Sequence, residues 1–204
     1  MEGPVKVAKR LFDLLLASVG LLMLAPLLVL IALAVKLDSR GPVFYRQERV
    51  GLQGRLFRIH KFRTMHHQPV ASGLQITVGR DARITRVGHV LRETKLDELA
   101  QLIDVWLGDM SLVGPRPEVP RYVAHYPAAL RDKVLSVKPG ITDIASIEYR
   151  DENRILAQAA DPEQAYIHEV MPHKLALAAQ YVDQASVWLD VQLIWRTLRA
   201  IVRR

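Results

Sequence analysis

Cysteine is absent from this sequence of 204 residues. Its absence excludes disulfide bonds, zinc sites built on thiolates and catalysis by a thiol, whereas metal sites made of histidine and carboxylate stay open. The sequence also lacks internal repeats and low-complexity tracts. Half of the residues are hydrophobic (50%), which suffices for a core, and the length favours one domain, with or without an appendage.

Acidic residues are in the minority. The sequence has 21 aspartates and glutamates against 28 lysines and arginines, and its formal net charge is +7. Such an excess of positive charge favours an anionic partner, which could be nucleic acid, acidic lipid or a phosphorylated substrate.

Charge is missing altogether from residues 14–35, "LLLASVGLLMLAPLLVLIALAV". A helix of about 22 residues measures about 33 Å, which is comparable to the hydrocarbon thickness of a bilayer. No polar stripe marks one face, as it would in a buried helix of a soluble protein. A cleaved signal peptide is a poor fit, because the run is too long and has no convincing cleavage site. We therefore predict insertion in a membrane.

The apolar run has a proline near its middle and basic residues on both sides. Pro26 removes the backbone hydrogen bond to Leu22 and bends the helix. A spanning helix normally carries its positive bias on one side only, so we expect a kinked, re-entrant helix whose two ends stay on the same side. The alternative is a plain spanning helix that tolerates a proline. The flanking residues are Lys6, Lys9, Arg10, Lys36, Arg40, Arg46 and Arg49.

The predicted fold class for the whole chain is α+β and mainly helical. Residues 41–51 and 55–65 are aromatic and β-branched runs that predict a small β-hairpin around the turn "GLQG". The apolar residues of 95–107 have helical spacing, and Gly108 provides a stop signal. Further expected elements are a loop at 66–79, a helix at 84–91, a proline-stiffened extended loop at 113–120, helix on either side of Pro127, a turn at 138–143 and a helix at 162–182 interrupted at Pro172.

The last segment, residues 186–204, projects as an amphipathic helix. Its apolar side chains share one face, with Trp188 and Trp195 at the edge and arginines beside it. That arrangement suits a helix lying in the headgroup region of a membrane. An ordinary helix packed on the domain explains the periodicity equally well, but the apolar run at the other end of the chain favours contact with the membrane interface.

Two adjacent carboxylates, Asp97 and Glu98, stand in "TKLDELAQL" at the predicted start of a helix. Thr94 and Asp97 have the spacing of a capping box, so the pair taken alone favours a structural role. In the first turn of a helix, however, the helix dipole would hold Asp97 ionised, and Arg92 and Lys95 would act in the same direction. An ionised aspartate is a competent nucleophile toward phosphorus, and Glu98 could hold a Mg²⁺ ion beside it.

Arginines gather near the carboxylate pair. Arg116 lies between Pro115 and Pro117, which restrict the backbone and present the guanidinium rigidly for bidentate phosphate contact. Any single arginine fits a solvated surface, whereas the cluster beside two carboxylates favours anion binding. His66 and His67 are adjacent in a predicted loop and are more typical of a surface than of a metal site. The arginines directly before the pair are Arg80, Arg83, Arg86 and Arg92.

Together these motifs resemble the bacterial sugar transferase family, in its monotopic phosphoglycosyl transferase form. The resemblance runs from "KRLFDLLLASVG" through "FRIHKFRTM", "DARITRVGHVLRETKLDELAQL", "VGPRPEVP" and "KPGIT", and more weakly into "YVDQASVWLDVQLIWRTL". It implies an enzyme at the cytoplasmic face of the bacterial inner membrane. Such an enzyme moves a sugar-1-phosphate from a UDP-sugar to polyprenyl phosphate and releases UMP, through a covalent phospho-aspartate, in the first membrane step of glycoconjugate or exopolysaccharide synthesis.

The resemblance also implies roles for individual residues. Asp97 matches the catalytic nucleophile, and Glu98 matches the glutamate of the Mg²⁺ site. Arg92 matches the arginine associated with polyprenyl phosphate, and Arg116 matches the arginine associated with the nucleotide diphosphate.

Other positions match less strongly or depart from the family pattern. Lys61 and Arg63 match the basic positions of the "KFRTM" motif and are weaker candidates for substrate binding. The re-entrant helix of the family breaks near a proline matching Pro26, but Ala25 precedes it here where members often have serine. A second departure begins at Asp143, after "GIT". We expect that region to shape the choice of sugar, which therefore stays open.

The resemblance divides the chain into a re-entrant membrane helix at 1–37 and a cytoplasmic catalytic domain at 38–204. By this resemblance, the chain corresponds to the minimal catalytic unit, without the further transmembrane helices of the larger family forms. The expected partners are a UDP-sugar, polyprenyl phosphate and membrane lipid, without nucleic acid, and a homodimer is left open. The alternative is a membrane-tethered basic protein that binds nucleic acid or acts as a scaffold on acidic lipid. The chain has no recognised nucleic-acid-binding motif.

Overall fold

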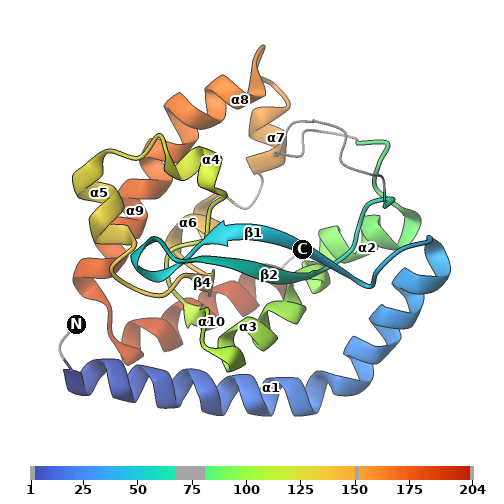
Figure 1. Ribbon diagram of the computed structural model, residues 1–204, viewed down its shortest axis with the longest axis horizontal. Coiled ribbons are helices and arrows are strands. Elements are labelled where there is room, and N and C mark those ends of the chain that lie inside the picture. Colours follow the sequence, from blue (N-terminus) through green and yellow to red (C-terminus); the bar gives the residue numbers. More distant parts are fainter. Residues whose placement is uncertain (1–2, 68–80, 150–151, 203–204) are drawn as a thin grey trace.

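A computed structural model describes residues 3–67, 81–149 and 152–202 and shows a mainly helical protein with two small sheets (Figure 1). The predicted α+β, mainly helical class is confirmed. Its longest element, α1 (Gly3–Asp38), runs along one side of the molecule and changes direction in its second half (Figure 1). Pro26 lies inside that half, where the missing backbone hydrogen bond accounts for a bend.

Polar contacts fasten both ends of α1 to the rest of the chain. Near its start, the Asp13 carboxylate accepts a hydrogen bond from the backbone N–H of Leu112 (3.1 Å). At its end, the Asp38 carboxylate accepts one from the backbone N–H of Val87 (3.1 Å). Among the described residues, α1 is the one helix long and apolar enough to cross a membrane.

The predicted β-hairpin is confirmed. Strands β1 (Phe44–Val50) and β2 (Leu56–Phe62) pair antiparallel around the short 3-10 helix η1 (Leu52–Gly54). Phe57 and Ile59 of β2 are buried against α1 and α3. Because successive strand side chains alternate between faces, this packing fixes the orientation of the end of β2, from which the "KFRTM" segment continues.

The middle of the chain follows the prediction in outline. Helix α2 (Arg86–Thr94) takes the place of the helix expected at 84–91. The helix expected at 95–107 begins as the 3-10 helix η2 (Leu96–Gln101) and continues as α3 (Leu102–Leu107). Gly108 ends α3 in the left-handed conformation (φ 95°), so the predicted stop is confirmed. Most of the loop expected at 66–79 lies outside the described residues.

The predicted capping box is wrong. Thr94 is the last residue of α2, and its hydroxyl donates to the carbonyl of Val90 (2.7 Å). Lys95 adopts a left-handed conformation (φ 60°) and separates α2 from η2, which has no side-chain cap. Asp97 therefore stands in a 3-10 turn, and the argument from the dipole of a long α-helix does not apply to it.

A short parallel sheet occupies the region where an extended loop and a turn were expected. Strand β3 (Ser111–Val113) pairs with β4 (Gly140–Thr142). Just beyond it, the backbone N–H of Gly140 donates to the carbonyl of Pro115 (3.0 Å). A Cβ atom on Gly140 would lie 2.1 Å from the backbone nitrogen of Gly114, so only glycine permits this approach. The contact holds the start of the "GPRP" segment.

Short helices and two longer ones complete the chain. Helix is present on both sides of Pro127, as predicted. The helix expected at 162–182 runs without a break from Pro162 to Gln184; in place of the predicted interruption at Pro172, it changes from π-helix to α-helix one residue earlier. The elements are α4 (Pro120–Val123), α5 (Ala128–Val134), α6 (Ile144–Glu148), α7 (Glu152–Leu156), α8 (Pro162–Ala165), η3 (Tyr166–Val170), α9 (Met171–Gln184) and α10 (Val187–Val202).

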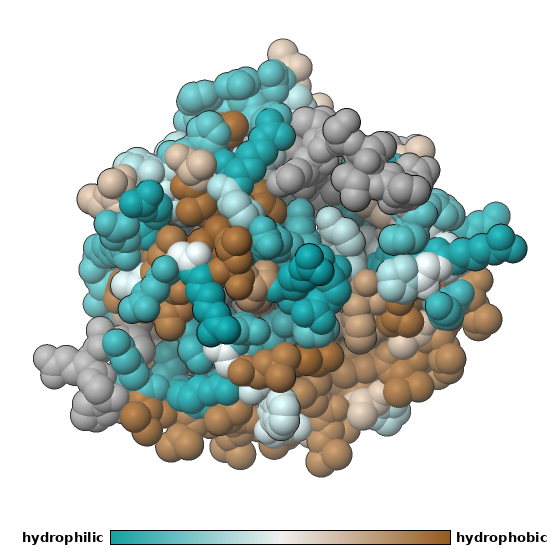
Figure 2. All heavy atoms as spheres, viewed as in Figure 1, coloured by the Kyte–Doolittle hydropathy of each residue, from teal (hydrophilic) through white to brown (hydrophobic). Residues whose placement is uncertain are grey.

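Hydrophobic side chains cover the side of the molecule along which α1 runs (Figure 2). Helix α10 is packed on the domain through Leu193, which is buried, yet it also exposes large apolar side chains. All three tryptophans of the sequence are among the exposed residues: Trp106 at 52%, Trp188 at 70% and Trp195 at 57%. Both interpretations of the last segment, packed and amphipathic, therefore hold in part.

Candidate active site

Four of the predicted site residues converge from three separate segments. Lys61 comes from the end of β2, Asp97 and Glu98 from η2, and Arg116 from the loop after β3. The Lys61 ammonium lies 2.9 Å from Oδ2 of Asp97 and 3.2 Å from Oε1 of Glu98, so it bridges the two carboxylates. The sheet and hairpin described above thus bring sequence-distant charges into one cluster.

Asp97 is almost fully buried, with 1% of its surface exposed. Lys61 contacts one of its carboxylate oxygens, whereas the other, Oδ1, has no hydrogen-bond partner in the structure. A buried carboxylate oxygen without a partner is costly unless something binds it. Asp97 therefore has one oxygen held by a cation and one buried oxygen whose hydrogen-bonding capacity is unused.

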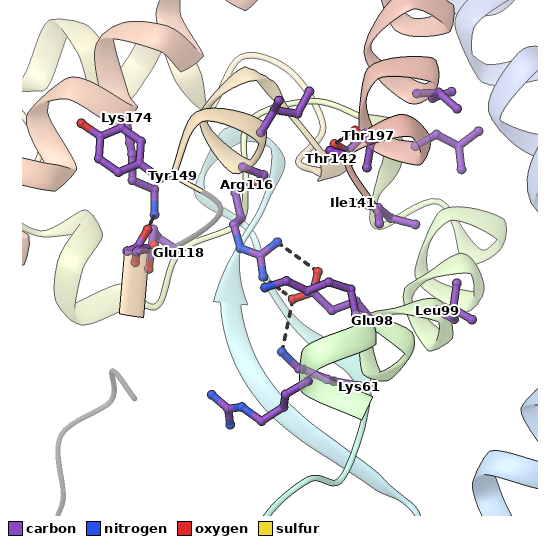
Figure 3. A pocket seen from close by; sticks show the side chains of 18 of the residues that line it. Lys61, Glu98, Leu99, Arg116, Glu118, Ile141, Thr142, Tyr149, Lys174 and Thr197 are labelled. Carbon is purple, nitrogen blue, oxygen red and sulfur yellow. Dashed lines mark hydrogen bonds and ion pairs between the residues drawn. The ribbon is translucent and has the colours of Figure 1, made fainter. Parts of the chain in front are cut away.

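Glu98 is held by two cations at once. Arg116 binds it in a bidentate manner, with Nη1 at 3.2 Å from Oε2 and Nη2 at 2.5 Å from Oε1 (Figure 3). Burial alone would raise the pKa of Glu98, but Arg116 and Lys61 outweigh burial and hold that pKa well below its usual range. In return, Glu98 raises the pKa of Arg116. Both groups are charged at neutral pH.

Arg116 is positioned by its backbone as well as by its flanking prolines. Its backbone N–H donates to Oδ2 of Asp143 (3.3 Å), and Oδ1 of Asp143 accepts from the backbone N–H of Ser146 (2.7 Å). Asp143 is buried and caps the start of α6. The sequence marked Asp143 only as a departure from the family pattern. No helix was predicted after Asp143, so its capping role was missed.

Arg92 and Arg63 occupy different places from the cluster. Arg92 lies near the end of α2 and lines the large cavity that opens beside the cluster. Its Nη1 lies 3.5 Å from the hydroxyl of Thr64. Arg63 is buried, and its guanidinium donates to backbone carbonyls at the end of α1, including Ser39 (2.8 Å) and Pro42 (2.6 Å). It does not border the cavity. The geometry gives Arg63 a structural role at the end of α1, whereas contact with substrate is unsupported.

The other arginines and histidines of interest do not join the cluster. Arg83 pairs with the neighbouring Asp81 (2.6 Å) on the surface, and Arg80 lies outside the described residues. Within the part of the chain that the structure describes, no three histidine or carboxylate side chains gather as a ready-made metal site; His66 and His67 are thus in no such group.

The carboxylate pair nevertheless fits a Mg²⁺ ion. Mg²⁺ is usually bound through one or two carboxylates together with substrate phosphates, so a dedicated protein cage is not required. Asp97 offers its unpartnered Oδ1, and Glu98 is the adjacent second carboxylate. Glu98 could serve as a ligand once Arg116 or Lys61 releases one of its oxygens.

A cavity of about 880 Å³ opens beside the cluster, and its lining changes character from one end to the other. Glu98, Arg116 and Lys61 lie in the middle (Figure 3). One side, here called the apolar arm, is lined by Leu16, Gly20, Leu99, Leu102, Leu112, Ile141, Ile194 and Leu198. The other side, here called the polar arm, is lined by Arg49, Glu118, Tyr122, Tyr149, Glu152, Tyr166 and Lys174.

Sequence reasoning found the polar arm only in part: Tyr149 and Glu152 lie in the region after Asp143 that was expected to shape the choice of sugar, but the other residues were missed. Glu118 lies at the centre of this arm: Arg49 approaches Oε2 of Glu118 to 3.6 Å, and the hydroxyl of Tyr166 donates to Oε1. Burial would raise the pKa of Glu118, but Lys174 and Arg49 outweigh it and lower that pKa. The residues missed are scattered along the sequence, so among them only Glu118 had a local signal, its "PRPE" context.

The site is thus a carboxylate pair bridged by a lysine and clamped by an arginine; Glu98, Lys61 and Arg116 line a large cavity, whereas Asp97 is buried beside them and does not line it. The chain matches the family model of the bacterial sugar transferases over residues 5–204. It belongs to that family, as the sequence motifs predicted.

Curated relatives agree with this membership. The chain is 37% identical over 97% of its length to a UDP-glucose:undecaprenyl-phosphate glucose-1-phosphate transferase of Escherichia coli. It is 36% identical over 95% of its length to a UDP-N-acetylgalactosamine-undecaprenyl-phosphate N-acetylgalactosaminephosphotransferase of Aeromonas hydrophila. It is 36% identical over 94% of its length to the exopolysaccharide production protein PSS of Rhizobium leguminosarum.

The relatives differ in length. The chain spans 41% of the Escherichia coli protein and 43% of the Aeromonas hydrophila protein, but 94% of the Rhizobium leguminosarum protein. The match to the family model, residues 5–204, contains Asp97, Glu98, Arg116 and nearly all of α1.

Proposed function

We propose that this protein transfers a sugar-1-phosphate from a UDP-sugar to polyprenyl phosphate and releases UMP. The observation that carries the proposal is the buried Asp97 with its unpartnered Oδ1, beside a lysine and an arginine-clamped glutamate. The names of the Escherichia coli and Aeromonas hydrophila relatives support the donor and acceptor classes. Because those two names specify different sugars, they do not determine the sugar for this chain.

The reaction proceeds in two steps at one phosphorus atom. A carboxylate oxygen of Asp97 attacks the phosphorus that bears the sugar, the bond from that phosphorus to the bridging oxygen breaks, and UMP leaves with the electron pair. An oxygen of polyprenyl phosphate then attacks the same phosphorus, the bond to Asp97 breaks, and the carboxylate is regenerated. The products are UMP and a polyprenyl diphosphate sugar.

The cations make the approach of one anion to another possible. Phosphoryl transfer depends mainly on positioning and on compensation of negative charge. Before substrate binds, Lys61 and Arg116 pair with the carboxylates; the diphosphate of the donor competes for the same cations and thereby releases Asp97 for attack. When bound by Asp97 and Glu98, Mg²⁺ would neutralise phosphate oxygens and polarise the phosphorus. Arg92, at the edge of the cavity, is suited to the phosphate of the acceptor.

We also propose that α1 enters the membrane from one face and returns to it. Its two ends contact the same domain through Asp13 and Asp38, and a helix that crossed the bilayer would separate them. The three exposed tryptophans fit an interface, where an apolar ring and a polar edge are both satisfied. The site would then lie at the cytoplasmic surface of the membrane, within reach of a soluble donor and a lipid acceptor.

Trapping the intermediate tests the mechanism. The protein is incubated with a UDP-sugar labelled in the sugar and without polyprenyl phosphate, then digested and mapped. We expect label on the peptide that contains Asp97, none in Asp97→Asn, and normal labelling in the surface control Asp132→Asn, whose side chain is 73% exposed. Label on another residue, or turnover by Asp97→Asn, contradicts the assignment. Salt-dependent duplex binding without UMP release from any UDP-sugar would favour the nucleic-acid alternative.

A further inference from the structure

We infer that the polar arm of the cavity binds the sugar ring of the donor, and that Lys174 and Tyr149 of this arm select the sugar together with Ser146 in the cavity wall. The inference rests on the proposed function and extends it to the substrate-selecting residues. It follows from the shape of the cavity, from unpartnered polar atoms in its wall and from the spacing of Arg116 and Glu118.

The two arms of the cavity suit different substrates. The apolar arm is formed by α1, η2, β3, α3, β4 and α10, of which α1, α3 and α10 also expose large apolar side chains. Leu99 and Ile141 of this arm lie on one side of Arg116 (Figure 3). A hydrocarbon chain fits there without burying any unpaired polar group. The hydroxyl-bearing donor is therefore left with the opposite side, where Lys174, Tyr149 and Glu118 lie together (Figure 3).

Some buried polar atoms in the wall of the cavity have no hydrogen-bond partner. Among the described residues, three buried side-chain polar atoms have none: Oδ1 of Asp97, Nε of Arg49 and Oγ of Ser146. Arg49 and Ser146 both line the cavity. Buried polar groups are nearly always satisfied in native proteins, so an atom left unpaired beside a cavity indicates a missing hydrogen-bonding ligand. Ser146 and Tyr149 are three residues apart on α6 and its end, a spacing that places them on one face of a helix.

The backbone sets the distance between phosphate and sugar. Arg116 and Glu118 are two residues apart in the chain, so their Cα atoms are at most about 7 Å apart, and both side chains line the cavity. A hexose is joined to the donor's second phosphate through a single oxygen. A diphosphate held by Arg116 therefore places its hexose beside Glu118 and the residues around it.

The polar arm offers donors, acceptors and aromatic faces in the combination that a sugar needs. Lys174 donates to Glu152 (2.8 Å) and lies 5.1 Å from the ring centre of Tyr166. The hydroxyl of Tyr149 is paired with His173 (2.8 Å). A site built to hydrogen-bond a particular hydroxyl rejects a sugar that lacks it, because the site's buried polar groups are then left unpaired.

Two substitutions test the inference with UMP release as the assay. UDP-glucose, UDP-galactose, UDP-N-acetylglucosamine and UDP-N-acetylgalactosamine share one nucleotide and differ only in the sugar. Lys174→Met removes a charged hydrogen bond, so we expect kcat/KM for the preferred sugar to fall about 10- to 150-fold, and Lys174→Arg to recover part of the loss. Ser146→Ala removes a hydroxyl that has no partner within the protein; it should leave folding intact and lower kcat/KM for that sugar about 2- to 10-fold. Ser136→Ala, on an exposed hydroxyl, is the matched control.

The pattern across the four donors decides the outcome. Sugar binding predicts that the preference between donors shrinks while inhibition by UMP stays within about twofold of wild type. An equal loss for all four donors together with weaker UMP inhibition would assign the polar arm to the nucleoside and overturn the inference. An unchanged preference in both Lys174→Met and Ser146→Ala would overturn it as well. If wild type releases no UMP from any UDP-sugar, the proposed function fails first and the inference falls with it.

Discussion

The buried ion pair between Lys9 and Asp190 gives the sharpest test of how the membrane helix is attached. Lys9 of α1 lies 2.5 Å from the carboxylate of Asp190 in α10 and also donates to the carbonyl of Val113 (3.0 Å). The Asp190 side chain is 0% exposed, and its second oxygen accepts from the hydroxyl of Tyr181 (2.8 Å). The pair therefore joins α1 and α10, two of the helices that line the apolar arm.

Lys9→Met would leave a buried carboxylate with one hydrogen bond. Breaking a buried pair in this way costs about 3–5 kcal/mol. For a chain of this size each kcal/mol lowers the midpoint of thermal unfolding by about 2–4 °C, so we expect a decrease of roughly 6–20 °C in detergent. Replacing both partners, as Lys9→Met with Asp190→Leu, removes both charges and should recover most of the loss.

The same variant has a pH dependence of defined sign. Burial raises the pKa of Asp190, and Lys9 opposes that rise. A carboxyl whose folded pKa exceeds its unfolded value favours folding fully below the unfolded pKa, and this contribution is lost as the pH rises through the folded pKa. Without Lys9 the folded pKa rises further, so the deficit of Lys9→Met should shrink between pH 7.5 and pH 5. A loss below about 1 kcal/mol, or a double variant as unstable as the sum of its singles, would refute the reasoning.

Three further predictions follow from the site and its supports. Lys61→Met leaves both carboxylates without their shared cation, so UMP release should fall about 10²- to 10³-fold; a loss below tenfold would argue against a role in the reaction. Gly88→Ala places a Cβ 2.1 Å from the backbone oxygen of Thr64 and should destabilise the protein by about 3 kcal/mol in chemical unfolding. Val90→Ala, at an exposed position of the same helix, should stay within about 0.5 kcal/mol. In vesicles of brominated lipid, most of the tryptophan emission should be quenched, because all three tryptophans are exposed on apolar surface; unquenched emission would place them in water.

Local patterns predicted the elements that depend on neighbouring residues. The hairpin, the stop at Gly108 and the apolar helix α1 follow from alternation, a glycine and an uncharged run, each contained in a short window of sequence. The capping box failed because the left-handed conformation of Lys95 assigned Thr94 to the preceding helix. Nothing within the window "TKLDE" reveals that choice, since it is set by the packing of α2 and η2.

The candidate site was predictable only in part, for a similar reason. Asp97, Glu98 and Arg116 stood out because they lie in dense local motifs. Pairing of β3 with β4 joins three-residue strands about 30 residues apart along the chain, which no periodicity signals. In the polar arm, Arg49 and Lys174 lie close to Glu118 although they are far from it in the sequence. Only the tertiary fold brings these three residues together.

The proline-restricted "PRPE" segment carries both Arg116, proposed to hold the diphosphate, and Glu118, proposed to lie beside the sugar. The backbone of this segment is restricted by its prolines and held by the hydrogen bond from the backbone N–H of Gly140 to the carbonyl of Pro115. A substitution that shifts this backbone therefore displaces Arg116 and Glu118 together. A change of donor sugar is therefore best attempted at the cavity-lining residues of α6 and α9, where a side chain can be replaced without moving the "PRPE" backbone.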